Sequence, residues 1–296
     1  MTIRTPLRVL DAVKSAAGRR QYRYALRERV WRALSSLPFP LTFNARLPGK
    51  RLRIRVNTQD PVISRSIFVR GEWEHAESDF IRSYVTPGMI AVDVGANIGA
   101  HTLTLANCVG SEGRVHAFEP TRVFDTLAYN VSQNGFGERV TLNHCAVGAD
   151  DGTTRLMSCK PGFELFTSRG IPLVPEASTG EYVDYPVTTL DSYARSHRLD
   201  NIDFLKVDVE GSEELVFRGC AGLLAGRAIG CIMFEFNDVC MARNGDSPST
   251  MIDRIRSAGY HLTTFDDTGQ FRPFSDAMAS VFNILATRKP LRPSRQ

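Results

Sequence analysis

The residues with the clearest capacity for chemistry lie in the stretch DVGANIG, residues 93–99, between an apolar strand-like run and a helix-like run. Gly95 and Gly99 allow a ligand to approach the backbone, and the helix that follows would present free N–H groups. Glu119 comes 24 residues after Gly95 (119 − 95) and ends the next strand-like run. A carboxylate at that position can accept hydrogen bonds from both hydroxyls of a ribose. The pattern indicates a site for a ribose-bearing cofactor.

The composition of this turn distinguishes between cofactors. A dinucleotide site requires G-x-G-x-x-G, whereas Asn97 stands where the second glycine belongs. Asp93 adds a negative charge that would repel a pyrophosphate and attract the ammonium or sulfonium end of S-adenosylmethionine. The residues therefore favour S-adenosylmethionine, and a nicotinamide-dependent oxidoreductase remains an alternative. A turn that serves packing alone is the least favoured interpretation.

A second group of ionisable residues could supply a base. The run KVDVEG, residues 206–211, ends a strand-like segment, and alternation along a strand places Lys206, Asp208 and Glu210 on one side. Glu235 ends the next buried run at the same sheet edge. Crowded carboxyls raise one another's pKa, which suits a base that takes a proton from a hydroxyl near neutral pH. A structural ion pair between Lys206 and Asp208 is the alternative.

One histidine and a metal complete the candidates for catalysis. His101 directly follows the glycine turn, and we rank it after Glu210, Asp208 and Glu235 as a base because packing at the start of a helix explains it better. A divalent cation on the carboxylates could acidify a hydroxyl. No histidine shares that cluster, and we expect no metal.

These residues must be positioned by an alternation of strands and helices. Short apolar, β-branched runs recur along the chain and helix-like segments follow four of the first five; the runs are 89–94, 114–120, 139–148, 201–211, 228–237, 260–266 and 280–288. Such an alternation predicts an α/β fold with a seven-stranded, mostly parallel, doubly wound sheet, which binds ligands beyond the carboxyl ends of its strands. The long segment 149–199 interrupts the pattern. Its loop, residues 158–182, is expected to act as a substrate lid.

The first 55 residues differ from the rest in charge. They carry 14 Lys and Arg against Asp11 and Glu28, a net charge of 14 − 2 = +12, which leaves 4 − 12 = −8 for the remainder. Apolar residues recur there at helical spacing, with Gly18 as the expected break, before two strands in 41–57 and a helix in 75–85. Packing is the favoured role of this basic helix, and weak contact with an anionic membrane surface or another polyanion stays open.

Composition favours a cytoplasmic protein, with a peripheral membrane contact left open. No apolar run approaches the roughly 18 residues that span a bilayer, and the N-terminus lacks the apolar core of a secretory signal. The six cysteines contain no C-x-x-C pair and are expected to be small core residues. Nothing in the sequence specifies an oligomeric state.

Taken together, the motifs resemble one known family. The series GEWEHAESDFI, VDVGANIG, FEP, HCAVG, TTLDSYA, DFLKVDVEGSEELVFRG and IMFEFN is similar in order and spacing to the FkbM-type family of S-adenosylmethionine-dependent methyltransferases, from about Val69 to Arg288. The resemblance implies a class I methyltransferase (Rossmann-like) fold. It divides the chain into a basic extension at 1–68, a methyltransferase domain at 69–290 and a tail at 291–296.

The resemblance also implies roles for residues. It assigns the methionine part of the cofactor to Asp93, Gly95, Ala96, Asn97 and Gly99, the ribose to Glu119 with Pro120 beside it, and the adenine to Ala146 and Val147. Family members typically methylate hydroxyl groups of sugars, glycolipids or polyketide-type products, so the expected partner is a hydroxylated small molecule or glycan. A non-catalytic methyltransferase-like binding module is the remaining alternative.

Overall fold

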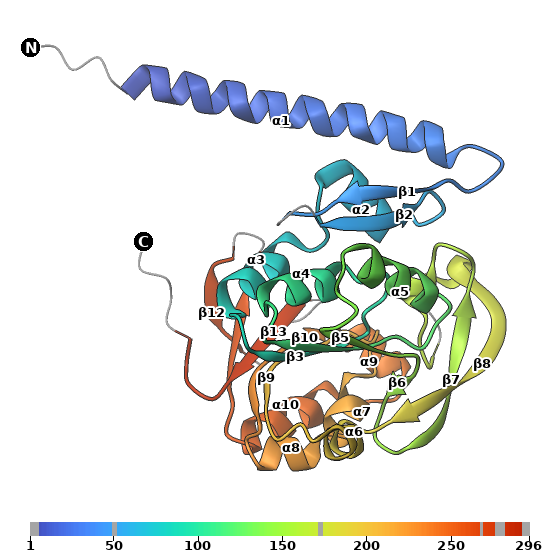
Figure 1. The fold of residues 1–296 in the computed structure, drawn as a ribbon, viewed down its shortest axis with the longest axis vertical. Helices are drawn as coiled ribbons and strands as arrows, with labels where there is room; N and C mark the ends of the chain where they lie inside the picture. Colours follow the sequence, from blue (N-terminus) through green and yellow to red (C-terminus); the bar gives the residue numbers. More distant parts are fainter. Residues whose placement is uncertain (1–5, 49–51, 171–173, 267–268, 276–281, 292–296) are drawn as a thin grey trace, which may run out of the picture.

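A computed structural model describes residues 6–48, 52–170, 174–266, 269–275 and 282–291. Its centre is an eight-stranded sheet with helices packed on both faces (Figure 1). The strand order is β12-β11-β13-β10-β9-β3-β4-β5. The bounds are β3 Ile90–Val94, β4 Arg114–Phe118, β5 Val140–Asn143, β9 Ile202–Val207, β10 Ile229–Phe236, β11 His261–Phe265, β12 Phe271–Pro273 and β13 Phe282–Thr287.

The directions of the strands confirm the doubly wound fold. The pairs β3/β4, β4/β5, β3/β9 and β9/β10 are parallel, and the order turns back at β3, where β9 lies on one side and β4 on the other. The strands β13, β11 and β12 pair antiparallel at the other end of the sheet. The sheet has one strand more than the seven expected. The additional strand is β12, which the sequence did not indicate because it is only three residues long and carries no apolar pattern.

Helices bury both faces of the sheet. One face packs under α3 (His75–Tyr84), α4 (Ala100–Cys108) and α5 (Phe124–Gln133), and the other against α6 (Leu190–His197), α7 (Glu213–Arg218), α8 (Ala221–Ala225) and α10 (Pro248–Ser257) (Figure 1). Neighbouring residues of β3 show this: Ala91 belongs to the first core and Val92 to the second. The expected helix after β9 is divided into α7 and α8 at Gly219, where a Cβ would lie 1.9 Å from the carbonyl oxygen of Gly148.

The expected third strand is also divided. It ends at Asn143, and the chain then leaves the main sheet to form β6 (Ala146–Val147), which pairs with β8 (Ser178–Thr188). The same strand β8 pairs antiparallel with β7 (Gly152–Cys159), so 146–188 builds a separate three-stranded sheet. The loop between β7 and β8 carries two single-turn helices, η1 (Glu164–Phe166) and η2 (Pro175–Ala177).

The N-terminal extension is structurally continuous with the main domain. Helix α1 (Pro6–Ser35) passes through Gly18 without the expected break, and the hairpin of β1 (Thr42–Arg46) and β2 (Arg53–Asn57) follows. The expected boundary at 68/69 falls inside α2 (Ile63–Arg70). Ile54 and Ile67 belong to the same buried cluster as Leu103 of α4, so the extension shares the core of the first face.

A short helix, α9 (Asp238–Arg243), follows β10 and brings its N-cap Asn237 to the sheet edge. Among the described residues, no helix combines the length and the apolar character that crossing a membrane requires.

Candidate active site

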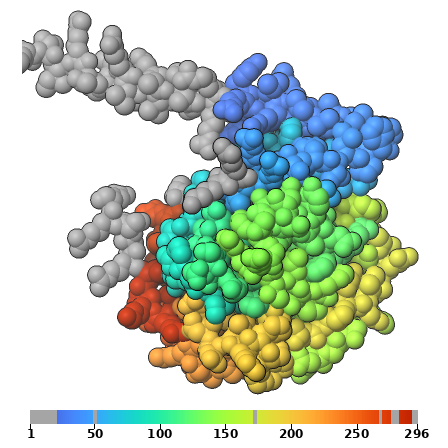
Figure 2. Space-filling view, in the orientation of Figure 1, coloured from blue at the N-terminus to red at the C-terminus, as the bar shows by residue number. Residues whose placement is uncertain are grey.

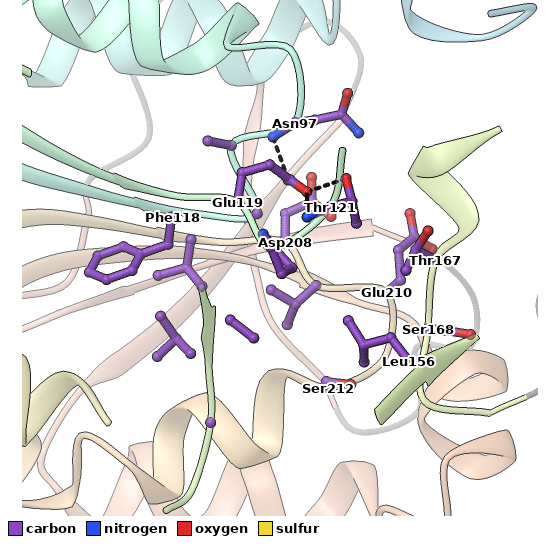
Figure 3. A pocket seen from close by; sticks show the side chains of 18 of the residues that line it. Asn97, Phe118, Glu119, Thr121, Leu156, Thr167, Ser168, Asp208, Glu210 and Ser212 are labelled. Atoms are coloured by element: carbon purple, nitrogen blue, oxygen red, sulfur yellow. Dashed lines mark hydrogen bonds between the residues drawn. The ribbon is translucent and has the colours of Figure 1, made fainter. Parts of the chain in front are cut away.

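A cavity of about 290 Å³ opens at the carboxyl ends of β3, β4 and β9, where the strand order turns back (Figure 3). Its walls include eleven of the fourteen residues that the sequence singled out: Gly95, Ala96, Asn97, His101, Glu119, Pro120, Ala146, Val147, Lys206, Asp208 and Glu210. Asp93, Gly99 and Glu235 do not line it. The size is close to the lower limit for small-molecule sites, about 300 Å³.

The glycine turn makes its hydrogen bonds within the protein. The N–H groups of Gly95 and Ala96 both donate to the Phe118 carbonyl, at 3.0 and 2.9 Å. The next three N–H groups donate to the Glu119 carboxylate, the Asn97 side chain and the Ala96 carbonyl. The N–H groups expected to be free are those of the helix that begins at Ala100, whereas the turn 95–99 itself has no free N–H group. A pyrophosphate needs such donors, so the turn does not support the dinucleotide alternative.

The two glycines of the turn are required by packing rather than by room for a ligand. Gly95 has φ +84°, and a Cβ there would lie 1.8 Å from the backbone oxygen of Asp208. Gly99 has φ +93°, and its Cβ would lie 2.7 Å from Cδ1 of Leu127. Glycine at 95 thus lets the turn after β3 cross directly over the end of β9.

Glu119 lies in the cavity wall with one acceptor position left over. Its Oε1 accepts from the Thr121 N–H at 2.8 Å and from Thr121 Oγ1 at 2.6 Å, and its Oε2 accepts from the Asn97 N–H at 2.9 Å (Figure 3). A carboxylate oxygen accepts about two hydrogen bonds, so Oε2 can take one more donor. Burial raises the pKa of this carboxyl. A hydroxyl donor from a ligand would therefore stabilise its charged form.

Apolar residues form the wall next to Glu119. Phe118 ends β4, while Ala146 and Val147 form β6, and all three line the cavity. Leu156 of β7 and Leu215 of α7 add aliphatic surface. This section of the wall is apolar, and it exists because β6 leaves the main sheet.

Asp93 lies behind the cavity wall. It is buried, and its Oδ2 accepts from Thr102 Oγ1 of α4 at 2.6 Å, while Oδ1 has no hydrogen-bond partner among the described residues. Asp93 pairs in register with Lys206 of the adjacent strand. Although burial opposes it, the charges of Asp208, Asp93 and Glu74 raise the pKa of Lys206. The structure thus pairs Asp93 with the strand position of Lys206 and places it outside the cavity lining.

The carboxyl end of β9 brings together the expected base candidates. Lys206 donates from Nζ to Asp208 Oδ2 at 2.9 Å, so the ion pair considered as an alternative is present. Strand β9 ends at Val207, and Glu210 adopts φ +52° in the following turn instead of continuing the alternation. Burial and the charges of Glu235, Asp208 and Glu213 raise the pKa of Glu210 well above its usual range.

Glu235 does not line the cavity, but its charge affects Glu210, which does. Glu235 lies at the end of β10 and burial raises its pKa to about 9, with Asp208 and Glu213 adding to the effect. Its Oε2 has no hydrogen-bond partner within the described part of the chain. Since Glu210 and Glu235 each raise the cost of ionising the cluster, one of them is expected to hold a proton when the other is charged.

His101 lines the cavity and is held by a residue that the sequence analysis did not single out. Its Nε2 lies 2.8 Å from Oε2 of Glu74, and its Nδ1 is buried without a partner among the described residues. Glu74 adopts φ +44° as the N-cap of α3. Although burial opposes it, the hydrogen bond to His101 lowers the pKa of Glu74. His101 is thus buried, as a packing residue would be, and its contact with Glu74 also fixes the orientation of its ring.

Other lining residues come from the loop between β7 and β8. Glu164, Leu165, Thr167, Ser168 and Arg169 all reach the cavity. Arg169 donates to Ser212 Oγ at 3.2 Å and forms an ion pair with Asp246, which fastens the loop across the turn after β9. The loop expected to act as a lid therefore contributes a wall. No sequence signal marks these residues individually, because they follow no periodicity.

Among the residues that the structure describes, no group of three or more His, Cys, Asp or Glu side chains is arranged to hold a metal ion.

Comparison with known proteins identifies the family. The sequence profile of the Methyltransferase FkbM domain matches residues 93–262, which include the glycine turn, Glu119 and the cluster at the end of β9. The chain is also 31% identical over 158 residues to 31-O-demethyl-FK506 methyltransferase FkbM of Streptomyces tacrolimicus. That match covers 45% of this chain and 60% of the relative.

Solved methyltransferase structures are similar at a lower level. Methyltransferase FkbM of Methylobacillus flagellatus KT matches with a TM-score of 0.42 at 16% identity, over 77% of this chain and 55% of that chain. An S-adenosylmethionine-dependent O-methyltransferase of Thermotoga maritima matches with a TM-score of 0.40 at 17% identity, over 79% and 74%. These scores are too low to add to the assignment, which rests on the profile, the motifs and the sheet. The chain belongs to the FkbM methyltransferase family.

Proposed function

We propose that the protein transfers a methyl group from S-adenosylmethionine to a hydroxyl oxygen of a sugar, glycolipid or polyketide-type product. The observation that carries this proposal is the cavity itself. At one place its wall has a buried carboxylate with a spare acceptor position, Glu119, and at another it has a cluster of acids around Asp208 and Glu210.

The lining fits the proposed cofactor. Glu119 Oε2 suits a ribose hydroxyl, and Phe118, Ala146 and Val147 suit an adenine ring. The acids near Asp208 and Glu210 suit the cationic methionine end. Bound there, S-adenosylmethionine supplies an electrophilic methyl group. The closed hydrogen bonds of the glycine turn suit a cofactor without phosphates.

The residues of the chain then have separable tasks. Glu210 takes the proton that the acceptor hydroxyl releases, since burial and the neighbouring carboxylates raise its pKa and with it its affinity for a proton. Lys206 keeps Asp208 in place through the ion pair at 2.9 Å and offsets part of the negative charge. Glu74 holds the ring of His101 at the cavity wall.

The acceptor class rests on three supports. The name of the Streptomyces tacrolimicus relative describes methylation of a 31-O-demethyl acceptor, which is an oxygen acceptor. The acid cluster provides the base that a neutral hydroxyl needs as its oxygen accepts the methyl group. The wall formed by Leu165, Thr167 and Ser168 offers both an apolar side chain and hydroxyls, as a hydroxylated organic acceptor requires.

Calorimetry tests the cofactor. We expect S-adenosylhomocysteine to bind and NADH not to bind; binding of NADH alone would overturn the proposal. The reaction is tested with S-adenosylmethionine carrying a ¹³C-labelled methyl and a panel of hydroxylated sugars, glycolipids and macrolides, with the product analysed by NMR. An O-methyl signal is the expected result. Labelling only of nitrogen or carbon in matched amine and carbon acceptors would contradict O-methylation while leaving methyl transfer intact.

A further inference from the structure

Exposed apolar side chains are concentrated on the N-terminal extension. Eight large hydrophobic residues of the described chain are exposed, and five of them lie between positions 22 and 39. Three are on α1, namely Tyr22, Leu26 and Val30, with 72%, 51% and 40% of their surface exposed. Leu37 and Phe39 follow in the turn that leads to β1. No comparable concentration occurs elsewhere on the described surface.

The three helix residues form one row. A spacing of four places Tyr22, Leu26 and Val30 on the same side of α1. The opposite side carries Trp31, which is buried and packs against Phe68 of α2 with ring centroids 5.4 Å apart. Helix α1 therefore has two apolar sides and the chain covers only one. Figure 2 shows the described part of α1 at the outer edge of the molecule.

Arginines border the exposed row. With about 100° of rotation per residue, Arg23 lies on one side of the row and Arg29 on the other. Both are exposed, and no carboxylate of the described chain pairs with them. Glu28 is turned to the inner side, where it accepts from Arg65 at 2.9 Å and from Arg32 at 3.2 Å. The outer side is thus apolar in the middle and positive at its borders.

We propose that this outer row, Tyr22, Leu26 and Val30 with Arg23 and Arg29, binds the surface of a membrane that contains anionic lipids. Aliphatic side chains of an interfacial helix enter the boundary between headgroups and acyl chains, and tyrosine favours the headgroup level. Arginines at the borders of the row face the phosphates and the negative surface charge. The arrangement matches each layer of such a surface with the side chain type that it prefers.

Two other occupants fit less well. A second copy of the chain related by a twofold axis would place the same arginines opposite each other, with no carboxylate on this side to pair with them. A nucleic acid would attract the arginines but leave the apolar row against phosphates, whereas such interfaces are polar. An anionic lipid surface satisfies both components.

The test is sedimentation of the full chain with vesicles. One set contains phosphatidylcholine alone and the other adds phosphatidylserine, both at low salt. We expect binding to the anionic set and its weakening as salt passes the screening range of roughly 0.1 M. Leu26→Ser with Val30→Ser should lower the partition coefficient about tenfold or more. Arg23→Gln with Arg29→Gln should lower it about 30-fold, since each charge near the surface contributes about fivefold.

Matched controls separate the row from general effects. Tyr182→Ser with Val183→Ser removes exposed apolar residues of β8, and Arg195→Gln with Arg198→Gln removes the same charge at the end of α6, on the far side of the molecule (Figure 1). Neither pair should change vesicle binding. S-adenosylhomocysteine binding should be unchanged in every variant, which distinguishes this test from that of the proposed function.

Three outcomes would overturn the proposal. The first is that the wild-type chain stays in the supernatant with anionic vesicles at low salt. The second is that the apolar double variant binds as well as the wild type, because adsorption would then be electrostatic only, as with RNA. The third is a dimer in analytical ultracentrifugation that Leu26→Ser with Val30→Ser dissociates, because the row would then be an interface between copies.

Discussion

Glu119 and Glu210 are both buried carboxyls at the ends of parallel strands, but their surroundings give them different properties. Three donors, the N–H groups of Asn97 and Thr121 and the hydroxyl of Thr121, hold Glu119 in place. Glu210 is surrounded instead by other carboxyls, which with burial raise its pKa. A carboxyl fixed by donors is suited to binding, whereas one whose proton affinity is raised is suited to proton transfer.

Loss of Glu119 should weaken cofactor binding. Glu119→Ala removes a hydrogen bond to a charged acceptor, worth about 1.5–3 kcal/mol, so the Kd for S-adenosylhomocysteine in calorimetry should rise about 10- to 100-fold. The control Glu112→Ala, at an exposed position, should bind normally. A Glu119→Ala protein that is folded by circular dichroism and binds with unchanged Kd would show that the ribose lies elsewhere.

Loss of Glu210 should affect turnover instead. Glu210→Gln keeps the shape of the side chain and removes the proton acceptor, so turnover should fall about 100-fold or more while S-adenosylhomocysteine binding stays near normal. Wild-type turnover should rise with pH through the pKa of the carboxyl cluster and then level off, because the base works when deprotonated. Glu235→Gln removes a neighbouring charge, so the rise should move to lower pH. Full turnover of Glu210→Gln with a true acceptor would refute its role as the base.

At the scale of elements, the turn after β3 and the end of β9 are in direct contact. Gly95→Ala should be strongly destabilising, because it combines a positive φ with a Cβ 1.8 Å from a backbone oxygen. The control Gly180→Ala has φ +78° with nothing within 4 Å, and it should cost only about 1–2 kcal/mol of unfolding free energy. We expect at least about 3 kcal/mol for Gly95→Ala in urea denaturation. Equal losses would mean that backbone strain alone determines both.

Glu213 makes the turn between β9 and α7 sensitive to pH. Its Oε1 accepts from the N–H groups of Val209 and Gly211, and burial raises its pKa from 4.5 to about 7. Because the pKa of Glu213 is higher in the folded state than in the unfolded state, this residue stabilises the folded protein fully when the pH is below 4.5. That stabilisation is lost as the pH rises through about 7. The free energy of unfolding should therefore fall between pH 5 and pH 8, and Glu213→Gln should reduce that fall by on the order of 2 kcal/mol. An identical fall in Glu213→Gln, compared with the exposed control Glu181→Gln, would contradict this assignment.

The strands around the site could be predicted because their signal is local. Buried runs of β-branched residues identified β3, β4 and β10 within two residues of their bounds, whereas β9, expected to reach residue 211, ends at Val207. The closed hydrogen bonds of the glycine turn could not be predicted, because their acceptor, the Phe118 carbonyl, is far along the chain. Glu74 was missed for the same reason, since its partner His101 is 27 residues away and only the fold brings the two together.

At the scale of the whole molecule, the extension and the methyltransferase domain should unfold together. The chain has two tryptophans, Trp31 on α1 and Trp73 at the cavity, and each can be made the only reporter. Trp73→Phe leaves a reporter in the extension, and Trp31→Phe leaves one at the site. Because Trp31 packs against Phe68 of α2, and α2 shares one buried cluster with Trp73 and α4, the two fluorescence transitions in urea should share a midpoint. An earlier transition for Trp31 would show that α1 detaches first.

The close contact that excludes a side chain at Gly95 also limits which substitutions this protein can accept. The turn and the carbonyl of Asp208 lie 113 positions apart (208 − 95), yet they occupy adjoining space with no room for a single methyl group. Under the proposed function, a shift of either backbone would move the residues assigned to the cofactor and those assigned to the acceptor at once. We therefore expect these two motifs to vary little, and we expect new acceptor specificity to arise by substitutions in the loop between β7 and β8 that keep Arg169, which fastens this loop across the turn after β9.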